Sequence, residues 1–81
     1  MTFTRTGPNS ARADDIEVKI AKRDQLHYVQ RGETVVVPIE IETDRVIAIA
    51  ISRIALPKRQ EVRSRISEAL DFLHIPYRFD S

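Results

Sequence analysis

One change in the spacing of apolar residues constrains the fold more than any other feature of this sequence. From Ile16 to Ile54, several segments have apolar side chains at every second position, which is the spacing of β-strands with one buried face. After Pro57 they follow the 3.6-residue period of an amphipathic helix, in the stripe Val62, Ile66, Ala69, Leu70 and Leu73. A series of strands is therefore followed by one helix, and Pro57 suits the first helical position.

The alternating segments predict four strands before the helix and one after it. They cover residues 16–20, 26–29, 33–42, 46–54 and 75–79. Gly32 marks a hairpin turn between the second and third of these strands. Pro38 and Pro76 cannot donate a ladder hydrogen bond, so we expect the third strand to lie at an edge or to carry a bulge, and the last strand to lie at an edge.

These elements predict an α+β fold in two layers. A mostly antiparallel sheet of four to five strands would be covered by one amphipathic helix, in the order β-β-β-β-α-β. The chain has 81 residues, which is the size of one small domain. Residues 1–14 show almost no apolar periodicity and are predicted to be a flexible N-terminal tail, so that residues 15–81 form a single α+β domain.

Composition argues against most kinds of active site. The chain has no cysteine, which excludes disulfides, thiolate catalysis and thiolate zinc sites. Its two histidines, His27 and His74, lack the spacing of a metal site, and its two glycines cannot form a phosphate-binding loop. We therefore expect no enzyme activity, no cofactor and no metal. The polar N-terminal segment lacks the apolar region of a secretory signal, which favours a cytoplasmic protein without a membrane partner.

One face of the predicted sheet is expected to lie open. A helix of roughly 16 residues is about 24 Å long and covers only part of a sheet of about five strands. The opposite face would carry small apolar side chains, namely Val36, Pro38, Val46, Ala48 and Ala50. Such a patch is typical of an interaction surface, so we predict a homodimer joined through this face or through a sheet edge.

A basic cluster surrounds the start of the helix and predicts a site for an anion or an acidic partner. It consists of Arg53, Lys58, Arg59 and Arg63. Two of these cations fall in the first helical turn, where the helix dipole disfavours them, and no capping side chain precedes Pro57. Helical geometry places Arg59 and Arg63 on one flank of the apolar stripe and Lys58 and Arg65 on the other, and Glu61 is spaced to pair with Arg65. An ordinary solvated flank is therefore the alternative interpretation.

The functional hypothesis is a small non-enzymatic protein-interaction module, a homodimer that acts as a binding or accessory protein. One alternative is a nucleic-acid-associated regulatory protein that uses the basic helix start, although the net charge of +1 and the five scattered aromatic residues favour an acidic protein partner over nucleic acid. The size and the order of sheet, helix and strand also resemble those of some small immunity proteins of bacterial toxin systems. That resemblance, which no diagnostic motif accompanies, implies a toxin-neutralising role.

Overall fold

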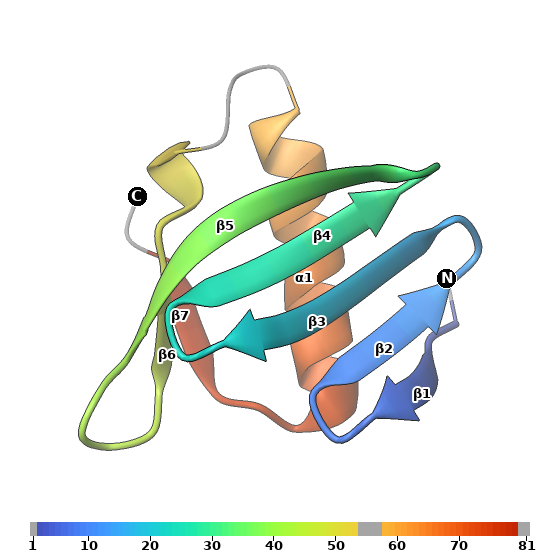
Figure 1. Ribbon diagram of the computed structural model, residues 1–81. Helices are drawn as coiled ribbons and strands as arrows, with labels where there is room; N and C mark the ends of the chain where they lie inside the picture. The colour runs from blue at the N-terminus through green and yellow to red at the C-terminus, as the bar shows by residue number, and fades with distance from the viewer. Residues whose placement is uncertain (1, 54–57, 80–81) are drawn as a thin grey trace.

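A computed structural model describes residues 2–53 and 58–79 of the chain (Figure 1). Within these residues, seven strands form one sheet in which the spatial order is the order along the chain. The strands are β1 (Thr4–Gly7), β2 (Ser10–Ala13), β3 (Ile16–Lys22), β4 (Gln25–Gln30), β5 (Glu33–Ile41), β6 (Ile47–Ile49) and β7 (Tyr77–Phe79). A short 3-10 helix, η1 (Ile51–Arg53), and the helix α1 (Arg59–Leu73) lie between β6 and β7.

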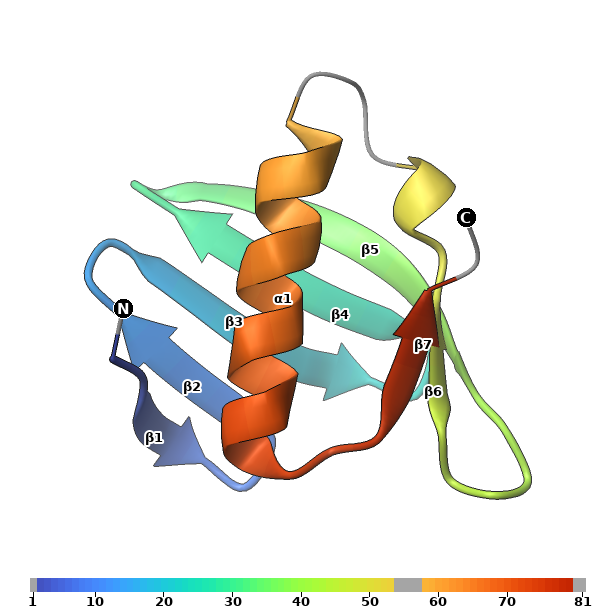
Figure 2. The same ribbon diagram turned by 180° about the vertical axis from the view of Figure 1, so that it is seen from behind.

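The sheet curls around α1 as a half-barrel (Figures 1 and 2). Neighbouring strands from β1 to β6 are antiparallel, whereas β6 and β7 are parallel. The helix crosses the concave side of the sheet and serves as the crossover connection that a parallel strand pair requires. The convex side of the sheet faces away from α1 (Figure 1).

The predicted architecture was wrong, although the α+β class is confirmed. In place of a two-layer fold with four to five mostly antiparallel strands, the described chain forms a curled, mixed sheet of seven strands. Each of the five predicted strand regions overlaps one of the strands β3 to β7, and β3 and β4 extend beyond the regions predicted for them. The two additional strands, β1 and β2, come from the segment that was predicted to be a flexible tail.

The N-terminal segment joins the sheet because small side chains alternate along it. Ala11 and Ala13 are buried and pair with Val18 and Ile16 of β3, respectively. Phe3 is buried as well, just before β1. Alanine carries a weak hydrophobic signal, so this alternation resembled a polar loop in the sequence. The expectation of a flexible tail therefore does not describe residues 3–13.

Pro38 determines where the pairing of β5 changes and where β6 ends. β5 pairs with β4 over residues 33–38 and with β6 over residues 39–41, so among the described strands it is an edge strand only in its first part. The N–H of Ile39 donates to Asp24 on the β4 side (3.0 Å), and the carbonyl of Pro38 accepts the N–H of Ala50 on the β6 side (2.9 Å). Proline has no N–H to return that bond, so the β5–β6 ladder ends there and the chain turns into η1. The strand predicted over residues 46–54 is therefore shortened to Ile47–Ile49.

The core lies between α1 and the concave side of the sheet. All five residues of the predicted helical stripe, Val62, Ile66, Ala69, Leu70 and Leu73, are buried, which confirms the helix and its orientation. The opposing strands contribute fully buried side chains that include Val18, Leu26, Tyr28, Val37 and Ile49.

At its start, α1 has Lys58 as N-cap without a side-chain hydrogen bond, in agreement with the absence of a capping residue. The predicted position of Pro57 lies outside the described residues.

Candidate functional site

A hollow of about 730 Å³ lies between α1 and β7, and we call it the α1–β7 groove. Its helical wall includes Arg59, Arg63, Ser67 and Glu68, and its strand wall consists of Tyr77 and Phe79. Arg59, Arg63 and Ser67 are spaced four residues apart, so they follow one side of the helix. The helix and the strand run alongside each other in opposite directions (Figure 2). The groove therefore has a basic end near the start of α1.

Aromatic contacts join the two walls of the α1–β7 groove. The guanidinium carbon of Arg63 lies 4.8 Å from the centroid of the Phe79 ring, which is within the range of a cation–π contact. The rings of Tyr77 and Phe79 meet edge to face at 5.5 Å. The hydroxyl groups of Ser67 and Tyr77 share a hydrogen bond. The strand wall is thus held against the helix at both of its aromatic residues.

The first turn of α1 is fixed by its contact with η1. Nη2 of Arg59 donates a hydrogen bond to the carbonyl of Ser52 at 3.1 Å. This bond anchors a side chain at the basic end of the groove to the segment that follows β6. Arg59 is half-buried and Arg63 is exposed, so the guanidinium group of Arg63 is the more accessible of the two.

The outer edge of β7 borders the same groove. β7 pairs with β6 on one side, where the N–H of Ile47 donates to the carbonyl of Pro76 at 3.1 Å. Backbone groups alternate in direction along a strand, so the N–H and carbonyl groups of Tyr77 and Phe79 point away from β6. In the part of the chain that the structure describes, no strand pairs with this side of β7. The edge position predicted from Pro76 is confirmed.

The structure separates the four cations of the predicted anion site. Arg59 and Arg63 both line the α1–β7 groove. Lys58 instead lines a different hollow, beside Arg31 and Glu33 at the turn between β4 and β5. Only the backbone of Arg53 belongs to the described part of the chain, so its predicted side-chain role lies outside it. Of the predicted cluster, Arg59 and Arg63 therefore line one groove. They lie on the helix flank on which the sequence analysis placed them.

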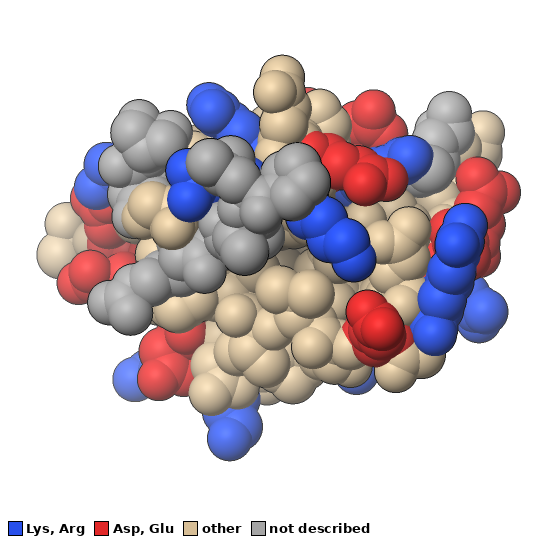
Figure 3. All heavy atoms as spheres, turned by 90° about the horizontal axis from the view of Figure 1, so that it is seen from above, with Lys and Arg blue, Asp and Glu red and all other residues tan. Residues whose placement is uncertain are grey.

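Charges near the helix start do not form one basic surface. Figure 3 shows Lys and Arg side chains interspersed with Asp and Glu on the face seen from above. On the flank of α1 away from the groove, Arg65 lies 3.8 Å from Glu61, as their spacing predicted. Within the groove, two arginines face one carboxylate, that of Glu68. The positive charge is therefore local to one end of the groove.

The predicted interface residues are distributed over the convex side and its margin. Val36 and Pro38 are exposed, with half of the Val36 surface accessible, whereas Val46, Ala48 and Ala50 are half-buried. Pro38, Ala48 and Ala50 line a hollow of about 320 Å³. Polar residues stand opposite them across the strands: His27 pairs with Val36, and both Glu40 and Arg78 pair with Ala48. Apolar and polar side chains thus alternate across this surface.

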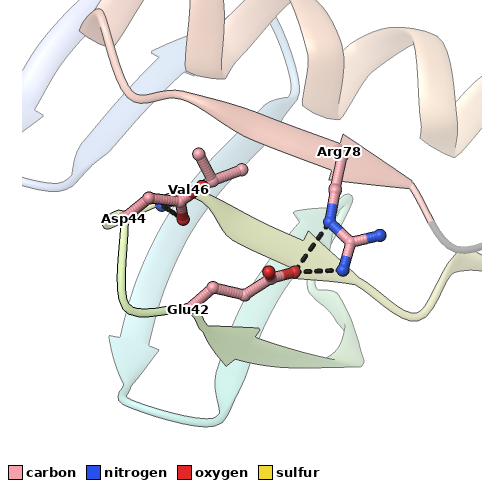
Figure 4. A network of polar contacts seen from close by, with 4 residues as sticks. All are labelled: Glu42, Asp44, Val46 and Arg78. Carbon is pink, nitrogen blue, oxygen red and sulfur yellow. Dashed lines mark hydrogen bonds and ion pairs between the residues drawn. The ribbon is translucent and has the colours of Figure 1, made fainter.

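An ion pair connects the convex side of β7 to the hairpin between β5 and β6. Arg78 donates from Nε (2.7 Å) and Nη2 to Oε1 of Glu42, across the intervening strand β6 (Figure 4). In the same turn, the Asp44 carboxylate accepts the N–H of Val46 at 3.1 Å. The final strand is therefore anchored on both sides, by Arg78 to Glu42 and by its aromatic residues to α1.

Sequence reasoning missed Ser67, Tyr77 and Phe79 as groove residues. The alternation of Tyr77 and Phe79 in the predicted last strand was visible, as was the edge position implied by Pro76. Their position beside the helix depends on β7 returning parallel to β6 after α1, and no local pattern encodes that pairing.

Among residues 2–53 and 58–79, no three His, Asp or Glu side chains gather as a metal ion would require. No helix within those ranges has both the length and the apolar character needed to cross a membrane.

Comparison with known proteins adds no functional assignment. No protein family, no curated protein and no solved structure matches this chain. The resemblance to small immunity proteins, which concerned only the order of elements, gains no support from these comparisons.

Proposed function

We propose that this protein is a small non-enzymatic binding module and that the α1–β7 groove holds a segment of a partner protein. The observation that supports it most directly is the unpaired edge of β7 beside Arg63, which lies over Phe79. A strand edge supplies hydrogen-bonding groups, aromatic rings supply apolar surface, and an accessible guanidinium supplies charge. These three features together suit a peptide segment better than a small molecule.

The groove also has the accessibility that a protein ligand needs. Its arginine end is exposed at Arg63, and its opposite end reaches the exposed carboxylate of Glu68. Among the described residues, the Ser67 hydroxyl bonds to Tyr77 and not to a general base that could activate it as a nucleophile. Binding rather than catalysis is therefore the function that this geometry favours.

Selection from a display library of random twelve-residue peptides tests the proposal. The wild-type protein and the variant Lys58→Glu should enrich the same peptides, because Lys58 lies outside the groove. The variant Arg63→Glu makes the same change of charge within the groove and should fail to enrich them. If the wild type enriches no peptide over the bare resin, or if Arg63→Glu retains the same set, the groove is not a peptide-binding site.

Self-association through the convex side is a second candidate function. It is favoured by the exposure of Val36 and by the hollow that Pro38, Ala48 and Ala50 line. Light scattering of the wild type should then give the mass of a dimer, and Ala48→Glu should give that of a monomer. A wild-type protein of monomer mass would remove this candidate without affecting the first.

A further inference from the structure

We infer that the segment held in the α1–β7 groove is an extended acidic peptide that adds to the sheet as a strand along β7. This inference rests on the proposed function and goes beyond it, because it specifies how the partner binds and what chemistry it carries. Three features support it in turn: the backbone groups that β7 directs away from β6, the charge of Arg63 beside them, and the charges of the two sheet edges.

The backbone groups that β7 directs away from β6 favour an extended conformation of the partner. Tyr77 and Phe79 together direct two N–H donors and two carbonyl acceptors away from β6. An extended chain can satisfy all four groups at once, because its own donors and acceptors recur at the same two-residue spacing. A helical segment keeps its backbone groups bonded internally and could use only the side chains of the groove.

The charges around β7 select an acidic sequence. Side chains of an added strand would alternate between the concave side, where Arg63 lies over Phe79, and the convex side, where Arg78 lies. The Arg78 guanidinium already bonds to Glu42 across β6, so the cation that the partner would contact is Arg63, on the concave side. Opposite charges on neighbouring elements attract, and like charges repel, so carboxylates are favoured on the concave face of the added strand, beside Arg63, and cations are disfavoured there.

Self-pairing through the sheet edges is opposed by the same charges. Two β7 strands paired about a twofold axis would bring Arg78 close to its own copy. β1, the strand at the other edge of the sheet, carries the exposed Arg5, so pairing of β7 with β1 of a second molecule would also bring arginines together. Charged side chains on edge strands commonly prevent such contacts between copies. An acidic peptide avoids this repulsion, which is why the occupant is a different chain.

The test uses the best peptide from the random library and measures its binding by fluorescence anisotropy. The peptide should contain Asp or Glu and alternate them with residues that favour strands. Methylation of its backbone nitrogens, one at a time, should weaken binding at least tenfold at alternate positions and less than twofold at the positions between them. Arg63→Glu should weaken binding at least tenfold, whereas the matched variant Lys58→Glu should leave it within twofold.

Amide hydrogen exchange gives a second readout that does not depend on variants. Saturating peptide should slow exchange at Tyr77 and Phe79, the two residues with outward N–H groups. Exchange at Ile47, whose N–H already bonds to Pro76, should not change and serves as the internal control.

The outcomes separate this inference from the function on which it rests. Peptides that bind the groove but tolerate every backbone methylation, or that are basic, would overturn strand addition by an acidic segment and leave a peptide-binding groove. If no peptide is enriched, both ideas fail. If a single-stranded DNA of twelve nucleotides binds more tightly than every selected peptide and loses binding in Arg63→Glu, the groove binds phosphate and the inference is wrong.

Discussion

The rings of Phe3 and Phe72 pack with their centroids 6.2 Å apart, so the residue just before β1 lies against the last turn of α1. Phe3 is 7% exposed and belongs to the same buried cluster as Ala11 and Ala13. The start of the chain therefore packs against α1 beside β1, the sheet edge opposite β7. If the start of the chain is a structural part of the sheet, removal of its buried side chains should lower the free energy of unfolding. Changes in a flexible tail should leave that free energy unchanged.

Replacing Phe3 with alanine should lower the free energy of unfolding by about 3 kcal/mol, because a buried aromatic ring is removed and leaves a cavity. Urea denaturation measures this loss. Thr2→Ala changes an exposed neighbour and should stay within about 0.5 kcal/mol of the wild type. A loss for Phe3→Ala no larger than that of Thr2→Ala would show that residues 1–14 contribute no more than a tail does.

The strength of the side-chain signal explains which elements were predictable. The stripe from Val62 to Leu73 contains large apolar residues at helical spacing, and it predicted both α1 and its buried face. The alternation in β2 rests on Ala11 and Ala13, whose small side chains give little contrast with their neighbours. Burial of those alanines depends on pairing with β3, which is a tertiary property.

The groove shows the same division between local and long-range information. Helical geometry placed Arg59 and Arg63 on one flank, and Pro76 indicated an edge strand. Neither observation predicts that the arginines lie beside the last strand, because their contact with it requires β7 to lie parallel to β6. The shortening of β6 likewise follows from Pro38, which lies in a different strand and acts on Ala50 across the ladder.

Replacing Tyr28 with phenylalanine should raise the free energy of unfolding by about 1 kcal/mol. Tyr28 is 1% exposed, and its hydroxyl group has no hydrogen-bond partner in the described part of the chain. A buried polar group without a partner loses its hydration and gains nothing in return. Chemical denaturation at neutral pH measures the change, and a clear loss of stability would show that the hydroxyl is satisfied.

Tyr77→Phe provides the matched control, because the Tyr77 hydroxyl bonds to Ser67 and its removal should lower stability.

Burial also raises the pKa of Tyr28 above its ordinary value of 10.0. A raised pKa means that ionisation of Tyr28 opposes folding, so the wild type keeps its stability below about pH 10 and loses it as the pH rises through the higher folded value. The Tyr28→Phe variant should therefore lose less stability than the wild type in alkaline solution.

The pKa of Asp15 should rise toward its ordinary value when Arg31 is replaced by alanine. Nε of Arg31 donates to the Asp15 carboxylate at 2.7 Å, and this hydrogen bond holds the pKa of Asp15 below 3.8. The pair links the turn after β2 to the turn after β4. A lowered pKa means that the stabilisation is present above about pH 4 and disappears as the pH falls through the folded value.

Carbon-13 NMR of the side-chain carboxyl groups follows this titration directly. Arg45→Ala removes an exposed arginine from a different turn and should leave the pKa of Asp15 unchanged. Both members of the pair are well exposed, so the variant Arg31→Ala should unfold close to the wild-type midpoint even where the pKa moves. An unmoved pKa would show that the hydrogen bond is absent in solution.

Replacing His74 with glycine should raise the free energy of unfolding by about 1 kcal/mol. His74 ends α1 in the left-handed conformation, at φ 59° and ψ 37°, and its N–H reaches the carbonyls of Leu70 and Asp71. Side chains with a Cβ are strained in that conformation, and glycine is not, so the substitution relieves strain while it keeps the capping bonds. Asp71→Gly places the same residue within the helix and should lower stability by about 1 kcal/mol. Thermal denaturation of the two variants should therefore move the midpoint in opposite directions, and a decrease in both would show that position 74 is not left-handed in solution.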